Sequence, residues 1–412
     1  MRIAFVLSSF PVVTETFIVN QMCALIDKGH SITILAHKKN EVSVLHESIV
    51  NYKLLDKVVY WTHEPKSKWK RFMGALGFIL TEKKNYSFGR LWNAFNFFKY
   101  GKDALSFHNF YKSRWFLKNG AFDIVHCHFA QFGLYVAQLK RDGFLTSEKI
   151  VTSFHGVDIM PDKLTSYRKN YAILFNQMDV VTYNSEYTKE LIEQITSERD
   201  SLRLLPVGLD TNHFRKKVNT VSNETFHMLF CGRLVPFKGP DLAIEILKKL
   251  LDKDHKVHLT IIGTGPLMDD ICKQIELHEL KSFVTLTGAI SQEAIIEIMD
   301  KSDVFLLPGI HDDVTGRAEN QGLVIQEAQS MELPVVVSDA GGMKYGLIHT
   351  ETGFVVKERN LTEFVEKLEI LIEDAALRKA MGARGRDYVV RQFDSEVLCE
   401  KLLSYYGEVL NE

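Results

Sequence analysis

Short apolar runs rich in β-branched residues alternate with amphipathic helical segments along most of the chain. The run "RIAFVLS" at residues 2–8 is followed by the helical segment "TETFIVNQMCALIDKGH" and then by "SITILA". A second series begins at "FHMLFCGRL", residues 226–234, and continues to the short run "TGFVV" at 352–356. Strands separated by helices are typical of parallel βαβ units. We therefore expect an α/β protein with two doubly wound, Rossmann-like parallel sheets.

The length of the chain agrees with two domains. At 412 residues it exceeds one ordinary core and fits two domains of roughly 150–200 residues each. Pro206 and Gly208 interrupt regular structure between the two series. We predict domains at 1–207 and 208–394, and a helix over 395–412 that packs back toward the first domain.

Composition excludes several classes of protein. A formal net charge of −2, with 25% charged residues, does not favour a nucleic-acid partner. The five cysteines form no C-x-x-C pair, which favours a reducing cytoplasm over a disulfide scaffold or a zinc ribbon. The apolar run at the N-terminus is too short for a secretory signal, and no apolar run in the chain approaches the roughly 20 residues needed to span a membrane.

Residues 61–118 differ from the rest, because they hold all four tryptophans and an excess of lysine and arginine. Basic, aromatic, amphipathic helices bind the surface of anionic membranes. A helical insertion that packs its aromatic side chains on the first sheet explains the same composition. Both interpretations stay open here, and they are compatible with each other.

Two cations follow the first strand of the second series. Arg233 and Lys238 lie in "GRLVPFKGPD", at the carboxyl edge of a parallel sheet, where ligands bind. Arginine can grip two oxygens at once and lysine acts as a point charge, so the pair suits a diphosphate. A solvated basic loop explains the pair equally simply.

The turn "GTGPL" at 263–267 connects a strand to a helix. Gly263 and Gly265 allow a ligand to approach the backbone, and the N-terminus of a helix favours anions. Met268 occupies the third glycine position of a dinucleotide fingerprint, which argues against an NAD-dependent oxidoreductase.

The stretch "RAENQGLVIQEAQS" at 317–330 places two carboxylates around the start of a helix. Gly322 is the expected start, and the first free N–H groups of the helix can bind a phosphate. Glu319 lies outside that end, and Glu327 lies roughly 8 Å along the axis. Because carboxylates accept hydrogen bonds from hydroxyl groups, the arrangement matches a nucleotide sugar: sugar, diphosphate, ribose.

These elements, in this order, resemble glycosyltransferase family 4, whose members have the GT-B fold of two domains facing across a cleft. The opening "SSFPVVTETFIVNQM" is similar to a branch that makes bacterial exopolysaccharides such as colanic acid and amylovoran. The resemblance implies a retaining hexosyltransferase without metal or cofactor. The donor is expected to be a nucleoside-diphosphate sugar, UDP favoured and GDP the alternative. The acceptor is expected to be a glycan or lipid-linked oligosaccharide. The matching stretches are "FHGVD", "GRLVPFKG", "IIGTGPL", "FVTLTGAI", "LLPG", "ENQGLVIQEAQSMELPVVVSDAGG" and "TGFVV".

The resemblance assigns roles on the donor side, in the second domain. Arg233 and Lys238 would bind the diphosphate, Glu327 the ribose, and Glu319 the donor sugar. The further donor contacts that it implies are Gly263 and Gly265, the backbone at Gly288 and Ala289, and the amides of Gln321, Gly322, Leu323 and Val324.

In the first domain, His155 would reach the donor sugar and join Glu319, Arg233 and Lys238 as the catalytic group. Asp158 would support the His155 loop. Standing alone, such a histidine is more often a packed or solvated residue. The expected acceptor-side residues are Ser9, Phe10, Thr14, Glu15, Thr16, His128 and Asp158.

The chain departs from the family pattern in three places. Many members have glycines where this chain has Ser8 to Pro11, many have E-G where it has Glu319-Asn320, and a glutamate usually follows "DAGG", where this chain reads "MKYGLI". We expect the acceptor contacts and the hydrogen bonds near the donor to differ there.

Fixed cations beside the leaving diphosphate make a metal unnecessary, and Asp312 and Asp313 are adjacent and loop-borne, a poor magnesium site. We expect a same-face displacement in which the departing phosphate oxygen takes the acceptor proton. Two rival functions remain: a sugar-phosphate synthase or phosphorylase with a soluble acceptor, and a non-catalytic GT-B binding protein. A cytoplasmic location, with residues 61–118 on the inner membrane surface, fits the glycosyltransferase with a glycan or lipid-linked acceptor best.

Overall fold

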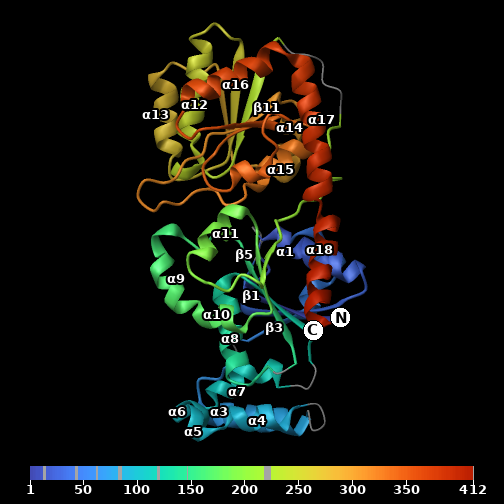
Figure 1. Ribbon diagram of the computed structural model, residues 1–412. Coiled ribbons are helices and arrows are strands. Elements are labelled where there is room, and N and C mark those ends of the chain that lie inside the picture. Colours follow the sequence, from blue (N-terminus) through green and yellow to red (C-terminus); the bar gives the residue numbers. More distant parts are fainter. Residues whose placement is uncertain are drawn as a thin grey trace.

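The computed structural model describes residues 1–12, 15–41, 45–61, 64–81, 86–117, 121–145, 147–217 and 224–411. Two parallel sheets form the centres of two domains, one above the other in Figure 1. The expected α/β architecture of two Rossmann-like domains is confirmed.

The N-terminal sheet has the strand order β3-β2-β1-β4-β5-β6-β7, with every pair parallel. Its strands are β1 Arg2–Phe10, β2 Ser31–Lys39, β3 Val58–Tyr60, β4 Ile124–His128, β5 Lys149–Phe154, β6 Val180–Tyr183 and β7 Leu202–Leu204. Its helices outside the insertion are α1 Thr16–Asp27, α2 Glu47–Asn51, α8 Ala130–Arg141, α9 Leu164–Asn170, α10 Ala172–Gln177 and α11 Glu186–Glu193.

Strand β1 is apolar without alternation because both of its faces are buried. Ala4 and Val6 belong to the core beneath α8 and α10, whereas Ile3, Phe5 and Leu7 belong to the opposite core, beside α1. Burial of both faces holds β1 in the centre of the sheet. The candidate site residues lie beyond the carboxyl ends of these strands.

The C-terminal sheet has the order β10-β9-β8-β11-β12-β13 and is also parallel. Its strands are β8 Phe226–Cys231, β9 Val257–Ile262, β10 Val284–Gly288, β11 Val304–Leu307, β12 Val335–Ser338 and β13 Gly353–Val356. Its helices are α12 Pro240–Leu251, α13 Met268–Leu277, α14 Gln292–Asp300, α15 Leu323–Ser330, α16 Leu361–Glu373 and α17 Ala375–Gln392.

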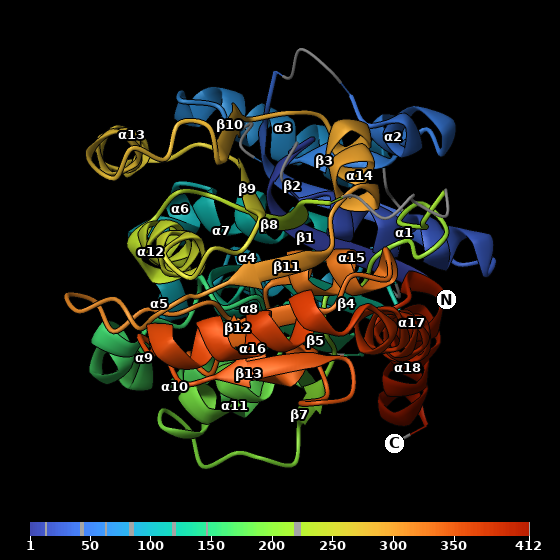
Figure 2. The ribbon, with the colours of Figure 1, turned by 90° about the horizontal axis from the view of Figure 1, so that it is seen from above.

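The last helix, α18 Ser395–Leu410, returns to the N-terminal domain. Figures 1 and 2 show α17 and α18 following one another along one side of the molecule. Leu402 and Tyr406 are fully buried in the N-terminal core, and the Tyr406 hydroxyl lies 2.6 Å from Nδ1 of His126. The C-terminal end of the chain therefore stabilises the domain that begins it.

Among the described residues between β3 and β4, five α-helices form the insertion. They gather at the end of the N-terminal domain that lies away from the C-terminal domain (Figure 1). Phe110 and Phe116 are buried in its core, whereas Trp69 and Phe98 are exposed. Within the described residues, no helix has the length and hydropathy needed to cross a membrane. The insertion helices are α3 Lys68–Thr81, α4 Phe88–Ala94, α5 Phe97–Tyr100, α6 Lys102–Leu105 and α7 His108–Ser113.

Candidate active site

Loops at the carboxyl ends of both sheets meet at the domain interface. Gly156, after β5, has φ +90°, and a Cβ built there would lie 2.1 Å from Cγ of Asn320. The Thr188 hydroxyl of α11 donates to Oδ1 of Asn320 at 3.3 Å. The Tyr345 hydroxyl donates to Glu190 across the same interface at 2.8 Å. The site residues of one domain thus lie against those of the other.

Lys238 and Glu319 form the central ion pair of the site. Lys238 ends a short 3-10 turn, Pro236–Lys238, and its Nζ lies 2.8 Å from Oε2 of Glu319. Both side chains are mostly buried, at 14% and 17% exposed. Burial acts to raise the pKa of Glu319, but the adjacent Lys238 ammonium lowers it overall. The carboxylate therefore stays ionised.

The predicted helix start at Gly322 is present. Gly322 has φ +73° and precedes α15, so the first amides of this helix lack partners within the helix. Leu323 and Val324, in the first turn, pack against the C-terminal core. Glu327 lies one turn further along α15, where the charge of Lys238 acts on its carboxyl group. One cation, one helix N-terminus and two carboxylates are therefore grouped together.

Burial raises the pKa of Glu327 from 4.5 to about 7, with the Lys238 charge acting in the opposite direction. The folded chain therefore holds this proton at pH values where the unfolded chain releases it, and stability falls as pH rises from 4.5 to about 7. The full effect is about 3 kcal/mol. In chemical unfolding, we expect Glu327→Gln to gain stability relative to the wild type as pH rises through this range. Glu297→Gln, on the exposed face of α14, is the control. A difference between wild type and Glu327→Gln that is constant with pH would refute the assignment.

Gly263 and Gly265 have a structural role that the sequence did not indicate. A Cβ at these positions would lie 2.0 Å from the carbonyl oxygen of Gly232 and 2.4 Å from that of Leu234. The neighbouring loop therefore leaves no space for a side chain at either position. Gly263 N also donates to the carbonyl of Gly288 at 2.9 Å, which joins the loops after β8, β9 and β10. Ala289 is exposed at the end of β10, and Arg233 is exposed in the loop after β8.

Three histidines stack at the ends of β4 and β5. Nε2 of His155 lies 3.0 Å from Nδ1 of His128, and the ring of His126 stacks on His128 at 4.5 Å. Burial lowers the pKa of His155 and His126 to about 3, and that of His128 well below its usual value. At neutral pH His155 is therefore uncharged and acts as a hydrogen-bonding group.

Asp158 holds the His155 loop in place. Its Oδ1 accepts from the His155 amide at 3.1 Å, and its Oδ2 accepts from the Ala130 amide at the start of α8 at 2.9 Å. Burial raises its pKa to about 6, although these backbone hydrogen bonds act to lower it. Asp158 therefore ties the loop after β5 to the loop after β4.

Two of the expected acceptor-side residues have no surface to offer an acceptor. Phe10 is 2% exposed, because its side chain belongs to the N-terminal core, and His128 is 1% exposed beneath His155. Ser9 is part-buried and its hydroxyl accepts from Asn40 at 3.1 Å. Glu15 and Thr16 are part-buried at the start of α1, where burial raises the pKa of Glu15. Thr14 lies outside the described residues.

Two sequence families match this chain, one over each domain of the fold. Glycosyltransferase Family 4 matches residues 14–213, and Glycosyl transferases group 1 matches residues 211–388. The chain is a family 4 glycosyltransferase. Its similarity to individual proteins agrees with this assignment.

The chain is 26% identical over 410 residues to the Salmonella typhimurium colanic acid biosynthesis glycosyltransferase WcaL, covering 98% of this chain and 99% of that one. It is 28% identical over 368 residues to the amylovoran biosynthesis glycosyltransferase AmsK of Erwinia amylovora, covering 87% of each. Among solved structures, Anabaena HepE in complex with UDP aligns with a TM-score of 0.73 at 15% identity, covering 99% of this chain and 100% of that one. The predicted GT-B fold is confirmed.

In this glycosyltransferase, Gln321 makes a contact that sequence reasoning missed. Its side chain accepts from the Val207 amide at 2.8 Å and donates to the Val207 carbonyl at 2.9 Å. The predicted role concerned only its backbone amide, and nothing in the sequence relates it to residue 207. Gln321, just before the helix start at Gly322, thus holds the linker between the domains.

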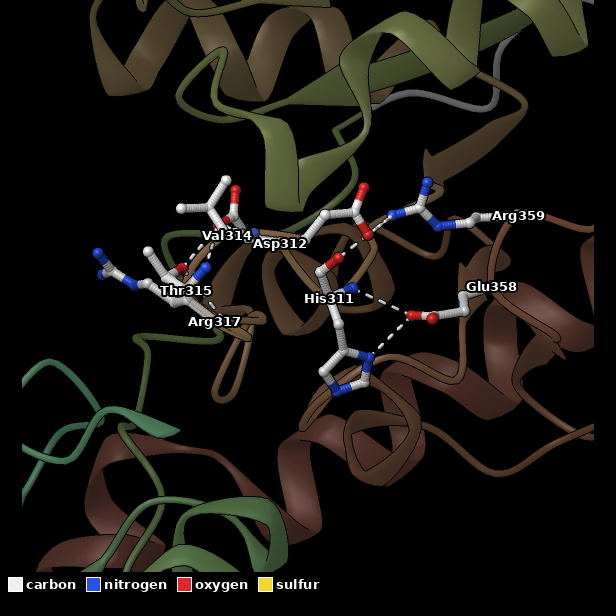
Figure 3. Close-up of polar contacts among 8 residues, drawn as sticks. His311, Asp312, Val314, Thr315, Arg317, Glu358 and Arg359 are labelled. Atoms are coloured by element: carbon white, nitrogen blue, oxygen red, sulfur yellow. Dashed lines mark hydrogen bonds and ion pairs between the residues drawn. The ribbon is translucent and has the colours of Figure 1, made fainter. Parts of the chain in front are cut away.

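The two adjacent aspartates of the glycosyltransferase lie in the loop after β11, and each carboxylate has its own partners (Figure 3). Asp312 accepts from the amide and hydroxyl of Thr315 at 2.8 and 2.7 Å, and Asp313 pairs with Arg359 at 2.7 Å. Asp312 thus organises its own loop, and Asp313 joins that loop to the segment after β13. Over the described ranges, no group of three or more His, Cys, Asp and Glu side chains is arranged to hold a metal ion.

Proposed function

We propose that this family 4 enzyme transfers a sugar, with retention and without a metal, from a nucleoside-diphosphate sugar to a glycan or lipid-linked oligosaccharide in bacterial surface-polysaccharide synthesis. The observation that carries the proposal is the group of Lys238, Glu319 and Glu327 around the N-terminus of α15. UDP is favoured because HepE, which has the same fold, was solved with UDP. The relatives WcaL and AmsK, named for colanic acid and amylovoran synthesis, support the polysaccharide.

The proposed step breaks the bond between the anomeric carbon and the diphosphate oxygen and forms a bond from the same carbon to the acceptor oxygen on the same face. The acceptor proton passes to the departing phosphate oxygen. Lys238, Arg233 and the amides of α15 stabilise the charge on the leaving group. His155, neutral at working pH, contributes a hydrogen bond to the sugar.

The test is transfer from UDP- and GDP-sugars to oligosaccharide-lipids extracted from cells that lack this chain. We expect a product that keeps the donor's anomeric configuration by NMR, and a rate unchanged by EDTA. An inverted linkage would refute retention. Loss of activity in EDTA that added magnesium restores would refute independence of a metal. Transfer only to a soluble sugar phosphate would favour the synthase alternative.

We also propose that the insertion places the enzyme on an anionic membrane surface. On α3, the exposed residues Trp69, Phe72, Met73 and Leu76 repeat at helical spacing, so this helix presents an apolar stripe to solvent. Such stripes flanked by cations are typical of helices that lie in the membrane interface. The other exposed large apolar side chains of the segment are Leu80, Phe88, Trp92, Phe97, Phe98 and Leu105, and its exposed lysines include Lys66, Lys68, Lys70 and Lys102.

Flotation with vesicles of anionic lipid tests this surface. The wild type should float with the vesicles, and the double substitution Trp69→Glu with Phe98→Glu should leave most of the protein at the bottom of the gradient. Both side chains are exposed, so the variant should fold normally. Leu277→Glu, at an equally exposed position on α13, should float like the wild type. Equal flotation of all three proteins would contradict membrane docking.

A further inference from the structure

A cavity of about 470 Å³ lies between the N-terminal sheet and the insertion, apart from the proposed donor site. It is bounded by β2, by the segment after β3, by the first turns of α8 and by α7. Its volume falls within the range of roughly 300–1,000 Å³ that small-molecule sites occupy. Nothing in the donor chemistry described above uses it.

Aromatic rings form one side of this cavity. The ring of Trp61 stacks on Tyr135 with centroids 5.4 Å apart, and Phe132 lies 6.3 Å from Trp61. The Tyr135 hydroxyl donates to the carbonyl of Lys112 at 2.6 Å, which fixes α8 against α7. The wall is therefore built from rings that are held by contacts on two elements.

Polar side chains form the rest of the lining. Glu64 lies 2.9 Å from the ring nitrogen of His108 and also 2.9 Å from Arg71, so its carboxylate is oriented. Gln131 is exposed at the rim, in the first turn of α8. Among the described residues that line the cavity, none is aliphatic. A hydrocarbon chain calls for aliphatic walls, whereas a sugar ring offers an apolar face to an aromatic ring and hydroxyls to carboxylate, imidazole and amide groups.

The cavity lies sideways from the predicted reaction centre. His128 and His155 follow β4 and β5, and the strand order continues from β4 through β1 and β2 to β3, which Trp61 follows. Three strand spacings of roughly 4.8 Å separate β4 from β3, about 14 Å in all. An acceptor of several sugars is therefore needed to reach both places.

We propose that this cavity binds a sugar ring of the acceptor glycan, away from the hydroxyl that reacts. The inference rests on the proposed function, since it takes the acceptor to be an oligosaccharide. It makes Trp61 and Gln131 determinants of acceptor specificity that act on acceptor binding and not on the chemical step.

The first experiment compares steady-state kinetics with oligosaccharide-lipid from cells that lack this chain. Trp61→Ala should raise the KM for this acceptor by about tenfold or more and leave kcat within about twofold. Gln131→Ala, a change at an exposed position that does not threaten folding, should raise KM about threefold. Leu277→Ala, which also removes a large apolar side chain but at an exposed position of α13, should have no effect. An unchanged KM in both cavity variants would overturn the proposal.

The second experiment measures binding directly. The glycan released from the same lipid should give saturation-transfer NMR signals with the wild type that Trp61→Ala loses, and polyprenyl phosphate without sugar should not displace it. Displacement by polyprenyl phosphate, or absence of glycan binding to the wild type, would overturn the proposal. UDP binding, measured in parallel, reports the donor site alone. Loss of UDP binding with glycan binding intact would therefore contradict the proposed function and leave this inference standing.

Discussion

Replacing Lys238 with alanine is expected to lower kcat about 100- to 1,000-fold, the effect of removing one fixed group that stabilises developing negative charge. Lys238 is mostly buried beside Glu319, so its ammonium is oriented before the ligand arrives. No other described cation forms an ion pair with Glu319. Substitution therefore removes the charge at the leaving group and also leaves a buried carboxylate without its counter-ion.

The measurement is steady-state transfer together with calorimetric binding of UDP. Lys248→Ala is the matched control, because Lys248 pairs with Asp252 on the exposed side of α12. The control should behave like the wild type in both assays. A Lys238→Ala enzyme that turns over at more than about a tenth of the wild-type rate would contradict the diphosphate role.

The second large effect is on stability. Replacing Glu148 with alanine is expected to destabilise the N-terminal domain by about 3–5 kcal/mol, because it removes the carboxylate from a buried ion pair. Arg90 of α4 donates to both oxygens of Glu148, at 2.8 and 2.9 Å, and to the carbonyl of Phe116 at 2.7 Å. The side chains are 4% and 0% exposed. This pair joins the insertion to the residue before β5.

Urea unfolding followed by tryptophan fluorescence measures the effect, since all four tryptophans lie in or beside the insertion. Glu224→Ala breaks an exposed ion pair with Lys256 and should cost less than about 1 kcal/mol. The double substitution Arg90→Met with Glu148→Leu should recover much of the loss, because two apolar side chains leave no buried charge. A loss for Glu148→Ala no larger than that of the control would show that the pair does not hold the insertion.

Much of the fold follows from local pattern. The central strands β1 and β8 are apolar because both faces are buried, and the helix start at Gly322 follows from a glycine before an amphipathic run. That Lys238 and Glu319 belong to one site was also expected, because the resemblance to family 4 assigns both to the donor.

What the sequence did not reveal depends on contacts between distant segments. The bond from Gln321 to Val207 joins residues 114 positions apart, and the glycines of "GTGPL" are required by the neighbouring loop at Gly232 and Leu234. Phe10 was expected on the acceptor side, beyond the first strand, yet β1 extends to it and buries it. The wall of Trp61, Phe132 and Tyr135 is assembled from segments more than 70 positions apart.

The central claim is that the start of α15, with Lys238 and Glu327, binds the nucleoside diphosphate. A crystal structure of the UDP complex tests it most directly. We expect the diphosphate within hydrogen-bonding distance of Lys238 Nζ and the amides of Gly322 to Val324, the ribose hydroxyls on Glu327, and Glu319 released from the lysine. UDP bound elsewhere, with the ion pair between Lys238 and Glu319 intact, would contradict it.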